Sequence, residues 1–228
     1  MKRDGQKIVA VVVYDYQLAQ IVDRAGVDIV SVGDSVGVNM WGQQSDDEVT
    51  VDQMVLACKA VRRGVSRAIV SCDVPSSVTD LVSAGRRLVD EGGADMVKVE
   101  ASAESIRTLV EAGIAVWAQL SKPDASIDDL VREATLFQSA GAALIDFRHS
   151  GPVAGLAVGA AVSIPVIGGL GGGPWLDGRV RAIANAIGYA AAALDDHADR
   201  YANVAQVALE AIASYAEDVR AGRQIKGK

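Results

Sequence analysis

Hydrophobic residues follow two alternating patterns along the chain. Short runs rich in Val, Ile and Leu are typical of buried strands, and longer stretches with apolar residues three or four positions apart are typical of helices. Seven runs of the first kind predict strands at 7–15, 28–34, 67–73, 95–100, 114–120, 143–149 and 164–170. Six stretches of the second kind predict the helices between them at 16–26, 50–64, 76–93, 102–113, 126–141 and 152–162. This alternation predicts parallel strands joined by crossover helices.

The pattern is less regular after the last of these strands. The Gly-rich stretch GGLGGGPWLDG precedes the Ala-rich segment 179–189. We interpret that segment as a short eighth strand that runs into a turn, with a helix as the alternative. A long amphipathic helix is expected at 199–222.

Eight strand–helix units predict a closed barrel rather than an open sheet. The chain has 228 residues, slightly fewer than the ~250 that are typical of a (βα)8 barrel. The first strand–helix turn has no G-x-G-x-x-G motif, which weakens the alternative of a doubly wound, dinucleotide-binding sheet. We therefore expect residues 1–228 to form a single-domain (βα)8 TIM barrel with a long C-terminal helix.

Composition and charge disfavour several classes of protein. The net charge is -7 and the basic residues are scattered, so nucleic-acid binding has little electrostatic support. The apolar runs have the length of strands rather than of membrane-spanning helices, and the start of the chain shows no signal-peptide cleavage site. Cys58 and Cys72 are too few for a disulfide framework. We expect a cytoplasmic protein that binds a small molecule.

Three consecutive predicted strands end in an acidic residue, namely Asp34, Asp73 and Glu100. Active sites of barrels lie at the C-terminal ends of the strands, so these carboxylates are expected to meet at the mouth of the barrel. Side chains alternate along a strand, which predicts the neighbour that shares a face with each acid. These neighbours are Val32 for Asp34, Ser71 for Asp73 and Lys98 for Glu100.

Converging carboxylates repel one another and raise one another's pKa unless a cation neutralises them. Hard oxygen ligands of this kind suit Mg²⁺. Lys98 cannot coordinate a metal, but its charge can stabilise an anionic substrate or a developing enolate. The alternative is that each acid caps the helix that follows it. Three acids in succession with an inward lysine favour the metal site.

Five segments of the chain resemble one known family in order. They are YDYQLAQIVDRAGVDIVSVGDSVG, DVP, EGGADMVKVE, SIPVIGGLGGGPWLDG and RYANVAQVALEAIASYAEDVRAG. Together they resemble the ketopantoate hydroxymethyltransferases, or 3-methyl-2-oxobutanoate hydroxymethyltransferases, of the phosphoenolpyruvate mutase/isocitrate lyase superfamily. The resemblance runs through nearly the whole chain.

The resemblance implies a (βα)8 enzyme that transfers a hydroxymethyl group from 5,10-methylenetetrahydrofolate to a 2-oxo acid held by Mg²⁺. It implies that Asp34 and Asp73 ligate the metal directly and that Glu100 holds a metal-bound water. Ser35 and Lys98 would bind oxygens of the substrate. Family members are oligomeric, so the resemblance also implies a homo-oligomer.

The chain departs from the family in the residues expected to move protons. A glutamate, the family's expected general base, corresponds to Arg148, and a family histidine corresponds to Gln119. A guanidinium stays protonated, so Arg148 cannot be a base, although it could clamp a carboxylate or phosphate or pair with Asp146. We expect Arg148 and Gln119 to bind substrate and Lys98 and Arg148 to contribute to catalysis. Lys98 and His149 remain candidates for the base.

Three functions are compatible with these residues. The first is a Mg²⁺-dependent hydroxymethyltransferase-like enzyme, a specialised paralogue that adds a one-carbon unit to the enolate of a 2-oxo acid. The second is a lyase or mutase that breaks a C–C or P–C bond of a 2-oxo or 2-hydroxy acid and needs no base for a C–H bond. The third is a non-catalytic relative that acts by assembly with a partner.

Overall fold

The computed structural model of the chain describes residues 2–100, 102–170 and 172–226. The chain divides into two compact units, Met1–Arg181 and Ala182–Lys228. The larger unit contains nearly the whole sheet and all the residues of the candidate site. The expectation that residues 1–228 form one domain stays a prediction.

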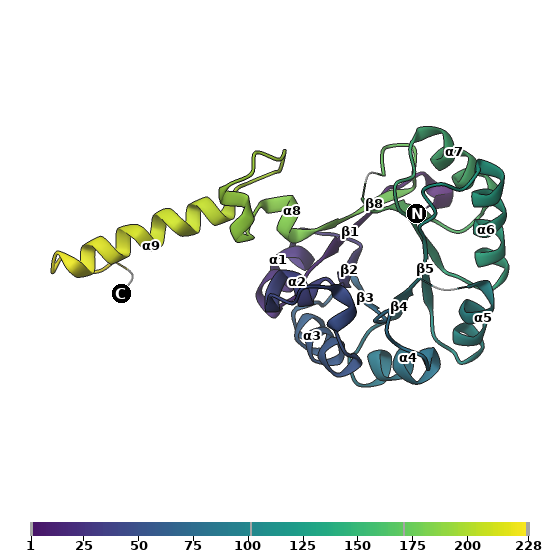
Figure 1. The fold of residues 1–228 in the computed structure, drawn as a ribbon, viewed down its shortest axis with the longest axis horizontal. Helices are drawn as coiled ribbons and strands as arrows, with labels where there is room; N and C mark the ends of the chain where they lie inside the picture. The colour runs from purple at the N-terminus through teal and green to yellow at the C-terminus, as the bar shows by residue number, and fades with distance from the viewer. Residues whose placement is uncertain (1, 101, 171, 227–228) are drawn as a thin grey trace. The chain divides into compact units, whose positions relative to one another are not determined.

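Eight parallel strands form a closed barrel in the order of the sequence. Their bounds are β1 (Ile8–Val12), β2 (Ile29–Val32), β3 (Ile69–Asp73), β4 (Met96–Val99), β5 (Val116–Leu120), β6 (Leu144–Phe147), β7 (Val166–Gly168) and β8 (Gly178–Ala182). Figure 1 looks into the ring of strands and shows α3 to α7 on its outer side. The (βα)8 barrel expected from the alternating pattern is confirmed, and the open doubly wound sheet is excluded.

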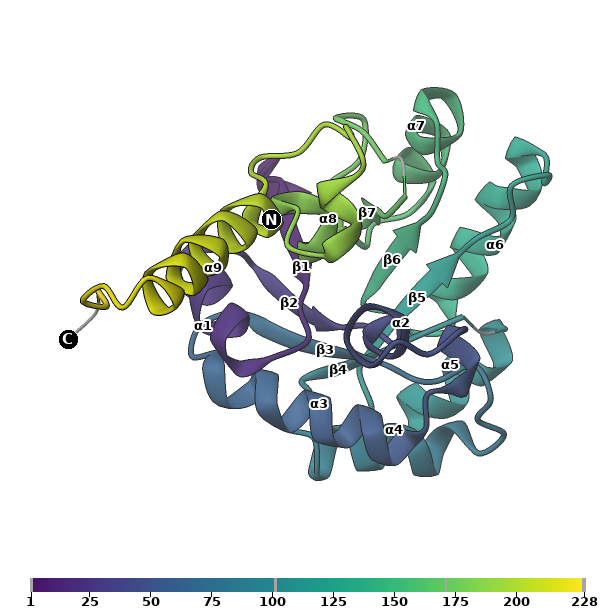
Figure 2. The same ribbon diagram turned by 60° about the vertical axis from the view of Figure 1, so that its left-hand side comes forward.

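Six helices lie close to the predicted positions. They are α1 (Tyr16–Arg24), α3 (Val51–Gly64), α4 (Leu81–Asp90), α5 (Ala103–Glu111), α6 (Ile127–Ser139) and α7 (Pro152–Ala161). Figure 2 shows α3 and α4 running along the outside of the strands. At the start of five of these helices, a side-chain oxygen accepts a hydrogen bond from a backbone N–H group of the first turn, which stabilises that turn. The capping residues are Asp15, Thr50, Asp80, Ser102 and Ser126.

The segment between β2 and α3 contains two short helices that the sequence pattern did not predict. These are α2 (Val36–Trp41) and the 3-10 helix η2 (Asp46–Glu48). Both are too short to show a helical period in the sequence. The start of η2 is stabilised by a capping box between Ser45 and Glu48. The Ser45 hydroxyl accepts a hydrogen bond from the backbone of the first turn, and the Glu48 carboxylate accepts one from the N–H of Ser45.

The Ala-rich segment 179–189 combines the two interpretations given above. It begins in β8 and continues into the helix α8 (Ile183–Ile187) instead of a turn. In the second unit, α8 is followed by the 3-10 helix η3 (Ala191–Leu194) and the long helix α9 (Val204–Arg220). The last helix therefore begins later than the expected residue 199, because Asn203 caps it by accepting a hydrogen bond from the N–H of Gln206.

The interior of the barrel changes from apolar to polar along the strands. The apolar layer contains Ile8, Ala10, Ile29, Met96, Trp117, Leu144, Ile167 and Val180. Farther along the strands, the hydroxyl of Ser71 donates to that of Ser31 at 2.8 Å. The last inward positions of β3, β4 and β6 are Asp73, Lys98 and Asp146, all of them buried. The charged layer therefore lies next to an apolar layer inside the barrel.

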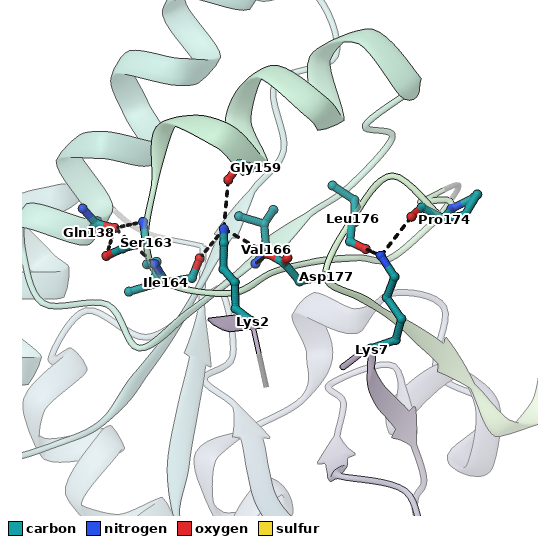
Figure 3. A network of polar contacts seen from close by, with 10 residues as sticks. All are labelled: Lys2, Lys7, Gln138, Gly159, Ser163, Ile164, Val166, Pro174, Leu176 and Asp177. Atoms are coloured by element: carbon teal, nitrogen blue, oxygen red, sulfur yellow. Dashed lines mark hydrogen bonds and ion pairs between the residues drawn. The ribbon is translucent and has the colours of Figure 1, made fainter. Parts of the chain in front are cut away.

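The segment near the N-terminus closes the barrel by tying β1 to the loop between β7 and β8 (Figure 3). Lys2, in the 3-10 helix η1 (Lys2–Asp4), donates to the carbonyls of Gly159 and Ile164 at 2.9 and 3.0 Å. Its ammonium group also lies 3.1 Å from a carboxylate oxygen of Asp177. The N–H of Ile8 donates to the carbonyl of Asp177 at 2.8 Å, which joins the two ends of the sheet.

Gly168 packs closely against the turn after β7, because a Cβ atom on Gly168 would lie 2.6 Å from the Cα of Gly172. Gly155 of α7 packs closely against Trp175, whose ring would lie 2.3 Å from an added Cβ atom. No helix within the described residues is long and apolar enough to cross a membrane.

Candidate active site

Six of the seven predicted site residues line one cavity at the C-terminal ends of the strands. They are Asp34, Asp73, Lys98, Glu100, Gln119 and Arg148. The cavity has a volume of 430 Å³, within the usual range for small-molecule sites. The seventh residue, Ser35, lies beside it and shares a hydrogen bond of 3.0 Å with the hydroxyl of Tyr14.

Asp34 reaches the cavity from a turn rather than from the inward face of β2. The inward residues of this strand are Ile29 and Ser31, so Val32 faces outward and the prediction that it shares a face with Asp34 is wrong. The chain turns at Gly33, where a Cβ atom would lie 2.9 Å from Val12 and 3.0 Å from the hydroxyl of Ser35. Glycine therefore permits the tight turn that presents Asp34.

Asp34 and Asp73 form a carboxylate pair whose charge is only partly balanced by Lys98, which lies 3.8 Å from Oδ2 of Asp73. Burial and the charges of Asp73 and Asp46 raise the pKa of Asp34 to about 7. Burial also raises the pKa of Asp73, although Lys98 and Arg148 partly oppose this change. The Oδ1 atom of Asp73 is buried and has no hydrogen-bond partner among the described residues. Such a pair is electrostatically unfavourable unless a proton or a metal ion is shared near it.

Lys98 lies between two buried carboxylates. Its Nζ atom is 3.2 Å from Oδ2 of Asp146 and 3.8 Å from Oδ2 of Asp73. It also lies 5.1 Å from the ring centroid of Trp117, where the face of the ring attracts a cation. Burial by itself would lower the pKa of Lys98, but the two carboxylates outweigh burial and raise it. Without a metal ion on Asp73, the two carboxylates therefore favour the protonated form of Lys98.

Arg148 follows β6 and pairs with Asp146, as the sequence predicted. Its Nε atom lies 3.5 Å from Oδ2 of Asp146, and its side chain is 30% exposed. The other carboxylate oxygen of Asp146 accepts the N–H of Gly169 at 2.9 Å. His149, the next residue, has a positive φ of 54° and is exposed. Of these two residues, only Arg148 lines the cavity.

Glu100 stands apart from the aspartate pair. Its Oε2 atom accepts a hydrogen bond from Nε2 of Gln119 at 2.6 Å, and the residue is exposed. Across the described part of the chain, no group of three or more His, Cys, Asp or Glu side chains is close enough to hold a metal ion. The structure thus brings Asp34 and Asp73 together, and the metal role of Glu100 stays a prediction.

The helix-capping alternative does not account for these acids. The N-cap residue of α4 is Asp80 and that of α5 is Ser102, and both accept backbone hydrogen bonds. Asp73 and Glu100 lie before these caps and have no such role. Ser35 occupies the N-cap position of α2 but makes no side-chain capping bond. The acidic residues are therefore free to serve the cavity.

Part of the cavity wall is formed by residues that the hydrophobic pattern did not indicate. Asp46 and Asp47 of η2 line the cavity beside Ser76, whose hydroxyl donates to Asp47. The run Ser45-Asp46-Asp47-Glu48 in the loop after the second strand was the available signal, because that loop lies at the active end of a barrel.

Comparison with known proteins gives a consistent result. A model of the ketopantoate hydroxymethyltransferase family matches residues 1–224. The 3-methyl-2-oxobutanoate hydroxymethyltransferase of Geobacillus kaustophilus is 33% identical, over 96% of this chain and 87% of the relative. That of Geobacter sulfurreducens is 34% identical, over 97% of this chain and 92% of the relative.

Solved structures of lower sequence identity share the fold. A 2,3-dimethylmalate lyase of the PEP mutase/isocitrate lyase superfamily has a TM-score of 0.66 and 14% identity, over 96% of this chain and 84% of the other. Phosphonopyruvate hydrolase in complex with oxalate and Mg²⁺ has a TM-score of 0.63 and 15% identity, over 97% of this chain and 85% of the other. The family model matches residues 1–224 and both relatives are at least 33% identical over most of their length, so the chain belongs to the ketopantoate hydroxymethyltransferase family of transferase enzymes.

Proposed function

We propose that this protein is a Mg²⁺-dependent enzyme that adds a one-carbon unit to the enolate of a 2-oxo acid. The observation that carries the proposal is that Asp34 and Asp73 line one cavity together with Lys98, whose Nζ atom lies 3.8 Å from Oδ2 of Asp73. Two acids and a lysine at the strand ends of a barrel supply both a cation site and a charge for an anionic substrate.

The residues present fit a divalent metal ion. The buried Oδ1 of Asp73 has no hydrogen-bond partner in the described part of the chain, and the neighbouring charge of Asp73 disfavours ionisation of Asp34. A cation would relieve both costs. Asp34 and Asp73 would hold Mg²⁺ directly, and Glu100 would hold it through a water. When bound, the ion would polarise the keto group of the substrate and make its C3 proton more acidic.

The polar residues of the chain would orient the 2-oxo acid. Lys98 is fixed by Asp146 and Asp73, so its charge would stabilise the oxygen on which negative charge develops. The hydroxyl of Ser35, held by Tyr14, would donate to the substrate's carboxylate. The amide of Gln119 is positioned by Glu100 and would contact the rest of the substrate.

Arg148 and Gln119 support a specialised paralogue rather than an enzyme of ordinary ketopantoate synthesis. Arg148 occupies the position expected for the family glutamate, and a guanidinium cannot accept the C3 proton. In the proposal the C3 proton would pass to Nζ of Lys98, because a metal ion held by Asp73 would weaken the negative charge that raises the pKa of Lys98. The proposed one-carbon donor is 5,10-methylenetetrahydrofolate, and formaldehyde is the alternative donor.

The test is to incubate the protein with Mg²⁺, either donor and a panel of 2-oxo acids. Mass spectrometry detects the hydroxymethyl product, and NMR in D₂O detects deuterium exchange at C3. We expect both with at least one acid, and their loss in Asp73→Asn but not in the surface control Asp90→Asn. If no acid forms a product or exchanges its C3 proton, the proposal is wrong.

A lyase or mutase is the second candidate. Arg148 occupies the position expected for the base, and the neighbouring carboxylates favour the protonated form of Lys98. When a C–C or P–C bond breaks, its electron pair becomes that of the enolate. No proton therefore has to be removed from carbon. Incubation with 2-hydroxy diacids and with phosphonopyruvate would distinguish the candidates, since a lyase releases a 2-oxo acid or phosphate without a one-carbon donor.

A further inference from the structure

We propose that the 2-oxo acid carries a cationic group, an ammonium or a guanidinium, at the far end of its side chain, and that Asp46 and Asp47 bind this group. This inference rests on the proposed function, because it assumes that the 2-oxo end of the ligand is held at Asp34 and Asp73.

The cavity is a ligand site on grounds that do not involve Asp46 and Asp47. Asp73 is 8% exposed, and its buried Oδ1 atom has no hydrogen-bond partner among the described residues. A buried carboxylate oxygen without a partner is costly, so a bound group is expected beside it. Asp46 and Asp47 line the same cavity at exposed positions, where they face the outer part of a ligand.

The charges around the cavity favour a cationic ligand. Among the described residues that line it, five are acidic and two, Lys98 and Arg148, are basic. Both basic side chains also pair with the buried Asp146, so part of their charge is already balanced. In the proposed function Mg²⁺ serves Asp34 and Asp73, while the carboxylate of the 2-oxo acid adds a further negative charge. A cationic group on the substrate would therefore lower the electrostatic cost of the complex.

Asp46 and Asp47 are held in place by local hydrogen bonds. They belong to η2, which begins with the capping box between Ser45 and Glu48, and the hydroxyl of Ser76 donates to Asp47. Across the part of the chain that the structure describes, the carboxylate of Asp46 has no hydrogen-bond or ion-pair partner. The two acids are therefore ordered before a ligand arrives, which lowers the entropic cost of binding.

An apolar surface lines the cavity beside Asp47. Pro75 and Val78 lie on either side of Ser76 in the sequence, and Leu81 begins α4. All four residues line the cavity with Asp47. Methylene groups pack favourably on such a surface, whereas a charged end group needs a polar partner. An apolar stem that ends in a cation matches both parts of this wall.

A single ligand can reach both ends of the cavity. Asp46 lies close enough to Asp34 for its charge to contribute to the raised pKa of that carboxyl, and both residues line one cavity of 430 Å³. A second metal ion is a poorer occupant beside Asp46, because no group of three or more His, Cys, Asp or Glu side chains in the described ranges could hold one. An organic cation needs no such set of ligands.

Two ligands of the same shape test this inference by calorimetry in the presence of Mg²⁺. The first, 5-(trimethylammonio)-2-oxopentanoate, carries a cation that cannot condense with its own keto group. The second, 6,6-dimethyl-2-oxoheptanoate, has carbon in place of the nitrogen. We expect the cationic ligand to bind about 5- to 30-fold more tightly at low salt, the range for pairing with two exposed carboxylates. Added salt should reduce this ratio, because it screens exposed charges.

Variants assign the preference to the two acids. In the double variant Asp46→Asn with Asp47→Asn the ratio of affinities should fall to within about 2-fold, and Asp46→Asn alone should lower it part of the way. The matched control is Asp90→Asn with Glu111→Gln, at the last residues of α4 and α5. It removes the same charge outside the lining of the cavity and should leave the ratio unchanged. Circular dichroism confirms that each variant is folded.

The outcomes separate this inference from the proposed function. Equal or tighter binding of the uncharged ligand, or binding of 2-oxobutanoate but of neither longer acid, would overturn the inference and leave the proposed function standing. A ratio that persists in the double variant would overturn the assignment to Asp46 and Asp47. If none of the three acids binds in the presence of Mg²⁺, the proposed function and the inference that rests on it both fail.

Discussion

Replacing Lys98 with methionine should destabilise the protein strongly. The substitution keeps most of the side-chain volume but removes the cation that lies 3.2 Å from Asp146 and 3.8 Å from Asp73. Asp146 is 1% exposed and Lys98 is 5% exposed, so water cannot replace the lost charge. Breaking a buried ion pair by removing one partner costs about 3–5 kcal/mol. We expect a loss of this size at pH 7 in metal-free buffer.

Urea denaturation followed by circular dichroism measures this loss. Lys122→Met is the matched control, because Lys122 pairs with Glu133 on the surface and such pairs contribute about 0–1 kcal/mol. Without Lys98, the pKa of Asp73, which burial already raises, would rise further, and the resulting penalty shrinks as the pH falls and Asp73 becomes protonated. The cost of Lys98→Met should therefore be smaller at pH 5 than at pH 7. Equal losses for Lys98→Met and Lys122→Met would refute the reasoning.

Two further predictions concern the scaffold of the barrel. Asp23, 4% exposed, accepts hydrogen bonds from the segment before β3: Ser66 N–H and hydroxyl, Arg67 N–H and Ala68 N–H. Burial alone would raise the pKa of Asp23, but these bonds lower it to about 2. The stability that Asp23 contributes to the fold should be complete above about pH 4 and should decline as the pH falls toward 2. Asp23→Asn should lower the free energy of unfolding by about 3 kcal/mol at pH 7. Unfolding curves that show no such loss would contradict this prediction. A Cβ on Gly178 would lie 2.0 Å from the carbonyl oxygen of Ile8, so Gly178→Ala should cost about 3 kcal/mol in a urea titration. Gly159→Ala, with nothing within 4 Å of the added Cβ, is its control and should be neutral or stabilising by about 0.5–1 kcal/mol; equal effects would refute the contact.

The barrel was predictable because its signals are local and repeated. Each strand is a short apolar run and each main helix carries an apolar face, so the alternation is visible without knowledge of the contacts. The convergence of Asp34 and Asp73 followed from the same logic, since parallel strands end on one side of the sheet. The pairing of Arg148 with Asp146 was one of the roles considered for Arg148, because the two residues lie only two positions apart at the end of β6.

Other features depend on geometry that the hydrophobic pattern does not encode. The inward face of β2 is occupied by Ile29 and Ser31, and Asp34 enters the cavity only because the chain turns at Gly33. The hydrogen bond between Gln119 and Glu100 joins residues from different strand ends, so neither spacing nor periodicity indicates it. The helix η2 has no period to detect and is defined by its capping box.

The most direct test of the central claim is calorimetric titration of Mg²⁺ into the protein near pH 6.5, with and without a 2-oxo acid. We expect saturable binding that is tighter with the acid, lost in Asp73→Asn and retained in Asp90→Asn. Asp34 has a pKa of about 7, so binding should release protons, detected as a dependence of the measured heat on the ionisation enthalpy of the buffer. Absence of Mg²⁺ binding, with or without the acid, would contradict the metal site and favour a relative that acts through a partner.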